Sequence, residues 1–555
     1  MRSQYLLVAA AAALFFAVAA SAATESAPVK LQLSTADHAL ALLGKIAGVP
    51  VKLQLSTADH SKFKALDQDF ASGPEVTKAC LSCHTEASKQ IHQTQHWKWE
   101  YINPDTKQVL GKKNVINNFC TSVESNYAAC ASCHIGYGMK DSKFDFSIEE
   151  NVDCLACHDH TGKYSKPGGF AGNPVARDTE FPAGSGKIIK GINLKEIAQK
   201  VGPTTRSTCG ACHFKGGGGD GVKHGDLDSS LENPDKALDV HMDAKGLNFA
   251  CATCHKTDDH KVSGSRYAPT AKDKAPAHMR GEADKTNPDT CQACHGQAPH
   301  KVVKLNEHTA KIACQTCHIP AFARGGVPTK MSWDWSTAGK LDKDGKFQTL
   351  RDENDYDTYM TIKGDFKWAE NVTPEYVWFN GTNKYTLIGD KIEKGGKPVQ
   401  INHFEGSATD GKSMIWPIKL FRGKQQYDPI NKSLVITHLA GNDDTAFWKN
   451  LDWVKAVTAG MAKGGVKFSG QVDFIETESM WAINHMVAPK EKALGCVECH
   501  ASKGRLDKID GVYMPGRSRD HARWLEIGGW LLASLTLLGV LGHGLVRIVA
   551  NKRNS

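Results

Sequence analysis

Eight short segments of the chain share the pattern Cys-x-x-Cys-His, and no other feature of the sequence limits the fold as strongly. They contain all but one of the 17 cysteines. The cysteines are Cys80, Cys83, Cys130, Cys133, Cys154, Cys157, Cys209, Cys212, Cys251, Cys254, Cys291, Cys294, Cys314, Cys317, Cys496 and Cys499, and the histidines are His84, His134, His158, His213, His255, His295, His318 and His500. Cysteine used on this scale indicates disulfides, metal sites or covalently bound cofactors.

The histidine after each cysteine pair decides among these alternatives. Zinc sites and redox disulfides also use Cys-x-x-Cys pairs, but neither requires a histidine directly after the second cysteine. Covalent haem attachment does, because the two sulfurs bind the porphyrin and the imidazole ligates the iron. Only 24 of the 555 residues are histidine, so chance does not explain the pattern. We therefore predict eight covalently attached c-type haems, and we number these haem segments first to eighth in chain order.

Each six-coordinate haem iron needs a second axial ligand, and histidines outside the haem segments can supply it. We prefer those that lie near a haem segment in sequence or in a loop that carries histidine. These are His60, His96, His224, His260, His300, His308 and His485, with His92, His160, His241, His278, His403 and His438 in reserve. For each of them an ordinary surface histidine is the alternative.

The two ends of the chain predict export and membrane attachment. Residues 1–23 combine a basic residue, an apolar run and small residues, as a secretory signal peptide does. An uncleaved anchor is the alternative. Residues 24–60 form a linker in which 28–38 recurs as 50–60. The uncharged stretch from Ile527 is long enough to cross a bilayer, so we predict a transmembrane helix over 527–550, with a buried core helix as the alternative.

Between these ends we expect two regions. Residues 61–325 form a heptahaem region with Gly- and Pro-rich loops, in which short helices wrap the porphyrins. Residues 326–515 carry the eighth haem segment and many tryptophans, and we predict an aromatic-rich helical region, with a helix over Asp444–Lys463 from the apolar spacing. The expected fold class is mainly α with extensive irregular loops, a multihaem cytochrome c fold built around eight haems, plus one C-terminal transmembrane helix.

The formal net charge of +8 does not indicate a nucleic-acid partner. Eight haems would add about sixteen propionates, which offset the basic side chains. The membrane and a small anionic substrate are the partners that we expect instead.

Four longer stretches around the haem segments resemble the octahaem tetrathionate reductase family, which is related to pentahaem nitrite reductases and hydroxylamine oxidoreductases. The stretches are NNFCTSVESNYAACASCHIGYG (Asn117 to Gly138), NVDCLACHD (Asn151 to Asp159), CGACHFKGGGGDGVKHGDLDSS (Cys209 to Ser230) and HTAKIACQTCHIPAFARGG (His308 to Gly326). The likeness runs from about His60 to His500. The C-terminal helix is an addition to the soluble members of that family.

The resemblance implies one catalytic haem, attached at the second haem segment (Cys130, Cys133, His134) and ligated by a lysine. The other haems are then bis-histidine and carry electrons. The family position of the lysine matches Lys166 best, with Lys163 as the second choice. A lysine binds iron only as a neutral amine, which burial or the metal can bring about.

Four further residues are candidates for the catalytic site. Cys120 is the cysteine outside the haem segments and lies ten residues before Cys130. Its thiol could engage sulfur substrates or oxidise reversibly, while a buried structural cysteine is the alternative. Asn117, Asp153 and Asp159 are candidates for hydrogen bonding or proton delivery. By analogy the resemblance also implies a calcium ion beside the catalytic haem, although no acidic cluster has a calcium-loop form.

Two functional hypotheses follow. The first is a membrane-tethered reductase at the periplasmic face of the inner membrane, which delivers electrons to tetrathionate or to nitrite and hydroxylamine. The rival is a non-catalytic electron-transfer cytochrome whose haems are all six-coordinate. Oxidation of hydroxylamine is a third option with the same architecture. The single helix carries no residues for quinol oxidation, so the expected electron donor is a quinol dehydrogenase or a soluble cytochrome.

Overall fold

The computed structural model describes residues 58–273, 289–393, 395–501, 503–512 and 523–553. The predicted signal peptide, nearly all of the duplicated linker and His278 lie outside the described residues. The chain divides into two units, residues 1–51 and 52–555, and the description below concerns the second.

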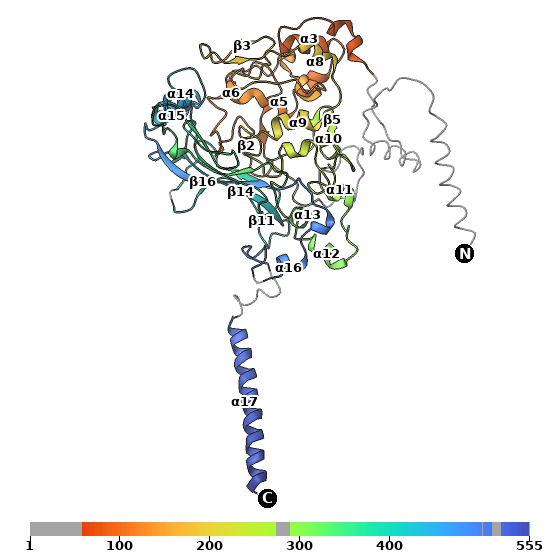
Figure 1. Ribbon diagram of the computed structural model, residues 1–555, viewed down its shortest axis with the longest axis vertical. Coiled ribbons are helices and arrows are strands. Elements are labelled where there is room, and N and C mark those ends of the chain that lie inside the picture. Colours follow the sequence, from red (N-terminus) through yellow and green to blue (C-terminus); the bar gives the residue numbers. More distant parts are fainter. Residues whose placement is uncertain (1–57, 274–288, 394, 502, 513–522, 554–555) are drawn as a thin grey trace, which may run out of the picture. The chain divides into compact units, whose positions relative to one another are not determined.

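Short helices joined by irregular loops make up most of the described chain before residue 329 (Figure 1). The helices are α3 (Gly73–Leu81), α4 (Ala87–Ile91), α5 (Gln95–Lys98), α6 (Tyr127–Cys130), α7 (Leu155–His158), α8 (Leu194–Gln199), α9 (Arg206–His213), α10 (Cys251–Cys254), α11 (Gln292–His295), α12 (Val303–His308) and α13 (Cys314–His318). Small hairpins pair β1 (Tyr101–Ile102) with β2 (Val109–Leu110), β3 (Thr179–Glu180) with β4 (Ile188–Ile189), and β5 (Thr257–Asp258) with β6 (Lys261–Val262). Helices this short are not stable alone, so contacts with the rest of the protein must hold them.

Local sequence signals set where the haem-bearing helices begin. Pro74 lies in the first turn of α3, where its missing N–H costs nothing. Thr205 caps α9 and forms a capping box with Thr208. Within a helix, cysteines three residues apart lie on one face, so α10 presents the thiols of Cys251 and Cys254 on the same side. The haem segments thus have the local form that attachment to one porphyrin edge requires.

A ten-stranded mixed sheet occupies most of the region from residue 329 to residue 482 (Figure 1). Its strands are β7 (Thr329–Asp334), β8 (Thr349–Arg351), β9 (Asp357–Met360), β10 (Gly364–Ala369), β11 (Glu375–Phe379), β12 (Asn383–Tyr385), β13 (Val399–Phe404), β14 (Met414–Asp428), β15 (Ser433–Leu434) and β16 (Asp473–Ala482). The main order is β12-β13-β16-β14-β7-β10-β9-β8, while β11 and β15 also pair with β14. The expected helical region and the mainly α fold class are therefore wrong for this part of the chain.

The centre of the sheet supports the stretch that leads into the second haem segment. β14 pairs antiparallel with β16, with Phe421 opposite Ser479, and parallel with β7. The ring of Phe119 packs 4.6 Å from Phe421 and 5.7 Å from Trp481, centroid to centroid. These residues belong to one core cluster with Trp333 and other aromatics. The sheet is thus a rigid platform beneath residues 117–120.

The predicted helix over Asp444–Lys463 is present in two pieces, α14 (Phe447–Asn450) and α15 (Trp453–Lys463). Leu451 adopts a left-handed conformation (φ 57°) and ends the first piece. Asp452 then caps α15 by accepting a hydrogen bond from the Lys455 N–H. α15 covers the core and buries residues such as Val457.

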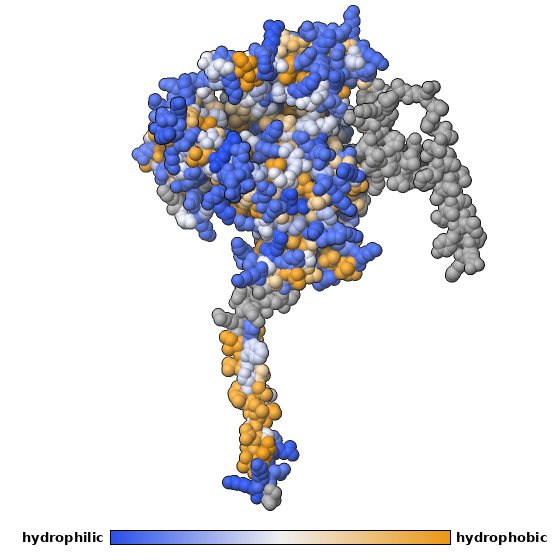
Figure 2. All heavy atoms as spheres, viewed as in Figure 1, coloured by the Kyte–Doolittle hydropathy of each residue, from blue (hydrophilic) through white to orange (hydrophobic). Residues whose placement is uncertain are grey.

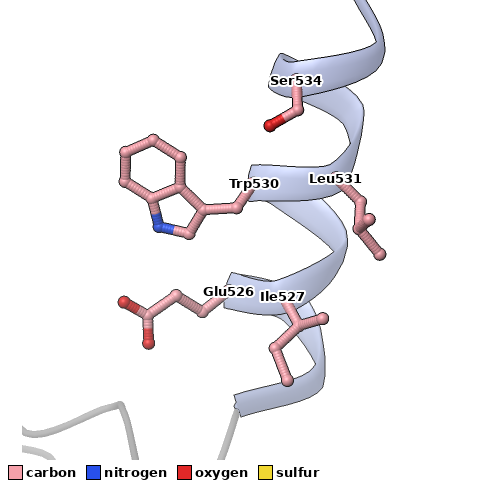
Figure 3. Close-up of a pocket in the computed structure, with 5 residues that line it drawn as sticks. All are labelled: Glu526, Ile527, Trp530, Leu531 and Ser534. Carbon is pink, nitrogen blue, oxygen red and sulfur yellow. The ribbon is translucent and has the colours of Figure 1, made fainter.

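The eighth haem segment lies at α16 (Cys496–Cys499), and the last helix is α17 (Arg523–Arg553). α17 contains an 18-residue window of mean hydropathy 1.7, none of which is buried, so by length and composition it can cross a membrane. Figure 2 shows its largely apolar surface. Figure 3 shows the residues that line a shallow hollow near its start, Glu526, Ile527, Trp530, Leu531 and Ser534. One helix supplies all five residues, so the hollow has no opposite wall and is not a candidate site.

Candidate redox site

Seven of the eight haem-segment histidines face a second histidine ring at a nearly constant distance. The centroid distances are 6.3 Å for His60 and His84, 6.1 Å for His96 and His213, 6.5 Å for His158 and His260, 6.0 Å for His241 and His295, 6.2 Å for His255 and His485, 5.9 Å for His300 and His318, and 6.1 Å for His308 and His500. The interplanar angles vary widely, so ring stacking does not explain the constant spacing.

This spacing fits iron between the two rings. A metal–imidazole bond is about 2.0 Å long and the ring centre lies roughly 1 Å behind the nitrogen, so two axial imidazoles have centres about 6 Å apart. Each pair also contains the histidine that follows a cysteine pair on the same short helix or turn. The residues present therefore fit seven c-type haems with two histidine ligands each.

The second haem segment has a different backbone. At the third, fifth and eighth segments the histidine N–H closes an α-helical turn onto the first cysteine, as in His158 N to Cys154 O at 3.1 Å. The N–H of His134 instead donates to Ala131 O at 2.8 Å, the tighter turn of a 3-10 helix (Ala131–Cys133), and His134 is extended (ψ 138°). The chain therefore leaves the helical path at His134.

The ring of His134 is turned into an aromatic box. It is fully buried, stacked on Trp97 at 5.4 Å, and edge-on to Trp99 and Phe144 at 4.9 and 5.4 Å. Its Nε2 lies 2.7 Å from the carbonyl oxygen of Trp97. Among the described residues, no histidine ring faces it as in the other seven pairs. The expectation that His134 ligates iron does not fit this geometry.

Lys166 occupies the space next to the His134 backbone. Its Nζ contacts the His134 carbonyl oxygen and lies 2.7 Å from Asp153 Oδ2, with only 4% of the lysine side chain exposed. Asp153 Oδ1 accepts hydrogen bonds from the hydroxyls of Tyr137 and Tyr164 at 2.8 and 2.9 Å. Lys166 is also within electrostatic range of the Cys133 thiol. The structure thus brings Lys166, Asp153 and the second haem segment together.

The alternative lysine lies elsewhere. Lys163 pairs with Glu196 at 2.9 Å on the surface, and 60% of its side chain is exposed. Asp159 accepts hydrogen bonds from Thr161 and from the Tyr164 N–H, so it shapes the loop between the two lysines. Neither Lys163 nor Asp159 is placed to touch a group bound at the second haem segment.

Asn117 and Cys120 share one turn on the sheet platform. The Asn117 Oδ1 accepts hydrogen bonds from the N–H groups of Phe119 and Cys120 at 2.9 and 3.0 Å. Cys120 Sγ lies 3.9 Å from the carbonyl oxygen of Gly217 and within electrostatic range of Cys130. Burial raises the pKa of the Cys120 thiol, and nearby lysines only partly offset this. The thiol is therefore protonated at neutral pH and is not a preformed nucleophile.

Three cationic side chains that the sequence did not indicate as candidates lie near the second haem segment. Lys223 Nζ and the Arg266 guanidinium lie 4.7 and 4.8 Å from the ring centre of Trp481. Lys112 Nζ lies 4.4 Å from the ring centre of Trp99, and Lys112 interacts electrostatically with Lys223. Burial, together with Arg266 and Lys112, holds the pKa of Lys223 well below its usual range.

Contacts between cysteines give the order of the haem segments in space. The paired thiols in contact are Cys80 with Cys154, Cys133 with Cys212, Cys209 with Cys251, and Cys291 with Cys314. Electrostatic contacts join Cys157 to Cys209, Cys254 to Cys291, and Cys317 to Cys499. The first, third, fourth, fifth, sixth, seventh and eighth segments therefore follow one another, and the second branches from the fourth.

Comparisons with known proteins agree with this geometry. The family model "Cytochrome c bacterial" matches residues 330–503, and "Cytochrome c554 and c-prime" matches residues 79–159. The crystal structure of octaheme cytochrome c from Shewanella oneidensis is 41% identical with a TM-score of 0.71, and the match covers 83% of this chain and 99% of that one. The chain belongs to the octahaem cytochrome c family. An uncharacterized protein of Archaeoglobus fulgidus is 26% identical over 229 residues, 34% of this chain and 75% of that protein.

Within this octahaem cytochrome c, most but not all of the preferred distal histidines lie beside a haem segment. Six of them face a haem-segment histidine, whereas His224 lies edge-on to Trp481 at 5.4 Å. Its place is taken by His241, a reserve candidate, which faces His295. The remaining described reserves bond elsewhere: His92 stacks on Trp97, and His160, His403 and His438 contact Pro203 O, Glu405 and Asp443.

A calcium site has no described ligand group. In the part of the chain that the structure describes, no cluster of three or more His, Cys, Asp or Glu side chains could hold a metal ion.

The residues that sequence reasoning missed are mainly cationic: Lys112, Lys223 and Arg266. Lysine and arginine in polar loops are usually solvated, so only their position around Trp99 and Trp481 distinguishes them.

Proposed function

We propose that this octahaem cytochrome c is a reductase at the periplasmic face of the inner membrane, anchored by α17, with eight attached haems. Seven segments would hold haems for electron transfer, and the second segment would hold the haem at which tetrathionate is reduced, with nitrite and hydroxylamine as further substrates. The observation that carries the proposal is the second segment itself. This segment differs from the other seven because the His134 ring is packed among aromatic side chains and no described histidine ring faces it.

In this proposal Lys166 ligates the iron of the second haem in place of His134. The lysine already lies beside the His134 backbone, and Asp153 holds its Nζ in position. Tyr137 and Tyr164 hold Asp153 in turn. His134 is the least suited of the eight haem-segment histidines, because its ring is packed between Trp97 and Trp99.

The chemistry needs two electrons and one open position. A haem held at the second segment by Lys166 would supply the electrons to a small anion bound beside it. Tetrathionate accepts two electrons, its central S–S bond breaks, and two thiosulfate ions leave. The aromatic box around the fully buried His134 closes one side of the second segment to water.

The order of the segments supports a path for the electrons. The eighth segment is the last before α17, and only residues 501–522 join the two. A quinol dehydrogenase in the membrane or a soluble cytochrome would therefore deliver electrons near the eighth segment. They would pass through the seventh to the fourth and then branch to the second.

The alternative function is a non-catalytic electron carrier. The seven paired histidine sites are compatible with this function. Seven six-coordinate centres in contact are what a conductor needs. Only the second segment departs from that pattern. The two functions therefore differ in one centre, and the experiment is aimed at it.

Anaerobic turnover of the holoprotein with a chemically reduced viologen dye and each of the three substrates tests the proposal. Low-temperature electron paramagnetic resonance of the oxidised protein should show one centre unlike the other seven. Lys166→Ala should abolish that signal and the turnover, whereas the matched surface variant Lys163→Ala should change neither. Eight bis-histidine signals that are unchanged in Lys166→Ala would support the electron carrier and refute the reductase.

A further inference from the structure

Two cations flank the ring of Trp481. Lys223 Nζ and the Arg266 guanidinium both lie less than 5 Å from its ring centre, at 4.7 and 4.8 Å. In the described part of the chain neither cation forms an ion pair. Arg266 donates one hydrogen bond, to the Tyr385 hydroxyl at 3.3 Å, while its Nε is buried without a partner.

The indole of Trp481 adds an unused donor. Only 6% of the residue is exposed, and its Nε1 is buried without a hydrogen-bond partner among the described residues. A buried donor without a partner costs about 1–3 kcal/mol. Its unmet hydrogen bond and the two neighbouring cations are complementary to the same kind of group, which is an anion.

Lys112 extends the cluster to the second haem segment. It interacts electrostatically with Lys223 and with the thiols of Cys130 and Cys133. The adjacent Lys113 provides an internal contrast, because it forms an ion pair with Glu100 at 3.0 Å. Lys112 has no such partner in the described residues. Two neighbouring lysines thus differ in whether the protein itself neutralises their charge.

Three like charges brought together away from bulk water repel one another, and a fold retains such a group only if something offsets the cost. An anion bound among them would do so and would favour the charged forms of all three. With all three side chains in their charged forms, the second charge of the anion would be neutralised as well. A dianion therefore gains more from this site than a monoanion or a neutral molecule.

We propose that Lys112, Lys223 and Arg266, with the Trp481 N–H, form the site that binds the substrate anion beside the second haem segment and ranks substrates by charge. Doubly charged sulfur oxyanions bind best, nitrite binds less well, and hydroxylamine does not use the site. This inference deepens the proposed function and depends on reduction at the same segment.

The test uses a series of ligands of decreasing charge on the holoprotein. Binding of thiosulfate and of nitrite is measured by calorimetry, and KM is measured for tetrathionate, nitrite and hydroxylamine. Loss of one charge-assisted hydrogen bond costs about 1.5–3 kcal/mol. Lys223→Met and Arg266→Gln should therefore raise the thiosulfate Kd and the tetrathionate KM by roughly 10- to 100-fold. The effect on nitrite should be smaller, and the effect on the uncharged hydroxylamine smaller still.

Matched variants separate charge from structure. Lys223→Arg should restore most of the thiosulfate affinity because it keeps the positive charge, and Lys113→Met should have no effect because Glu100 already neutralises Lys113. Equal losses for tetrathionate and hydroxylamine would overturn the proposal, since they would indicate that the cations hold haem propionates or the fold. Unchanged thiosulfate binding in Lys112→Met, Lys223→Met and Arg266→Gln would overturn it as well.

The same data distinguish the site from the proposed function. If the wild-type protein binds thiosulfate through these three residues but reduces none of the substrates, the anion site is supported and the reductase function is refuted. If the wild-type protein reduces tetrathionate and none of the three substitutions changes the KM, the reductase function is supported and the anion site is refuted.

Discussion

Lys166 Nζ and Asp153 Oδ2 lie 2.7 Å apart, with 4% and 0% of their side chains exposed. The contact is an ion pair by distance, although Oδ2 receives no well-directed hydrogen bond. Asp153 also accepts a hydrogen bond from the Ala156 N–H in the turn of the third haem segment. One carboxylate therefore links the lysine proposed for the second haem to the backbone of the third haem segment.

Replacing this carboxylate should release the lysine. Because a ligating Lys166 is a neutral amine, the loss is that of one contact with a charged carboxylate, which costs about 1.5–3 kcal/mol. We expect Asp153→Asn to lower the denaturant midpoint of the holoprotein and to change the resonance signal of the second haem. The control is Glu196→Gln, which breaks the exposed pair with Lys163 and should leave both unchanged. An unaltered signal in Asp153→Asn would show that this carboxylate does not position the ligand.

The partner of His295 can be tested by exchanging two histidines. His241 faces His295 at 6.0 Å, whereas His224 lies against Trp481. His241→Ala should convert one low-spin haem to high-spin, which is seen in low-temperature resonance spectra, because the sixth haem loses its second imidazole. His224→Ala should leave the number of low-spin haems unchanged. The opposite result would return His224 to the ligand set.

The sequence predicted the haem segments and most of their histidine partners for a physical reason. The attachment chemistry fixes residue types at fixed spacing, and six distal histidines lie near a haem segment or in a loop that carries histidine. His241 lies ten residues before Cys251, as near a haem segment as His224 is to His213, so distance along the sequence could not separate these two histidines. The conformation of His134 was also beyond prediction, since its residue pattern is identical to the other seven.

The sheet was missed because its strands do not show the usual alternation. Residues Met414–Phe421 of β14 are buried on both faces, so apolar residues follow one another without a period of two. β16 does alternate, but Thr477 and Ser479 lie on its buried face beside Ile475 and Trp481. Polar residues on the buried face remove the alternation of apolar and polar residues by which a strand is predicted from sequence. The lysine and arginine cluster was missed because it joins three segments that are distant in sequence.

Lys330 should make the stability of the protein depend on pH. Its Nζ lies 3.3 Å from the ring centre of Phe366 and 4.3 Å from that of Trp333, and burial lowers its pKa to about 7. The unfolded chain keeps this lysine protonated up to about pH 10.4. Between these values the unfolded state binds more protons, so the free energy of unfolding rises with pH, and the burial cost applies in full only below pH 7.

The comparison of wild type with Lys330→Met isolates this effect. The variant should be more stable at pH 6, and its advantage should shrink steadily between pH 7 and pH 10, at up to about 1.4 kcal/mol per pH unit. Denaturant unfolding across this range measures the difference. Lys367→Met, on the exposed face of the same strand β10, serves as the control and should show a constant difference. A constant difference for Lys330→Met would mean that the lysine stays charged in its aromatic surroundings.

In our proposal α17 alone attaches the protein to the membrane. Its removal should therefore change the location of the protein but not its catalytic activity. Deletion of residues 523–555 removes an apolar helix of which no part of the hydrophobic window is buried, so the haem-bearing body loses no core. We expect the truncated protein to move from the membrane fraction to the soluble periplasmic fraction and to retain its haem content and its turnover with a soluble electron donor. Deletion of residues 554 and 555 only, which leaves the helix intact, should keep the protein in the membrane fraction. A truncated protein that still sediments with membranes would place the attachment in the body or in a partner protein, whereas loss of haem would show that α17 contributes to the fold.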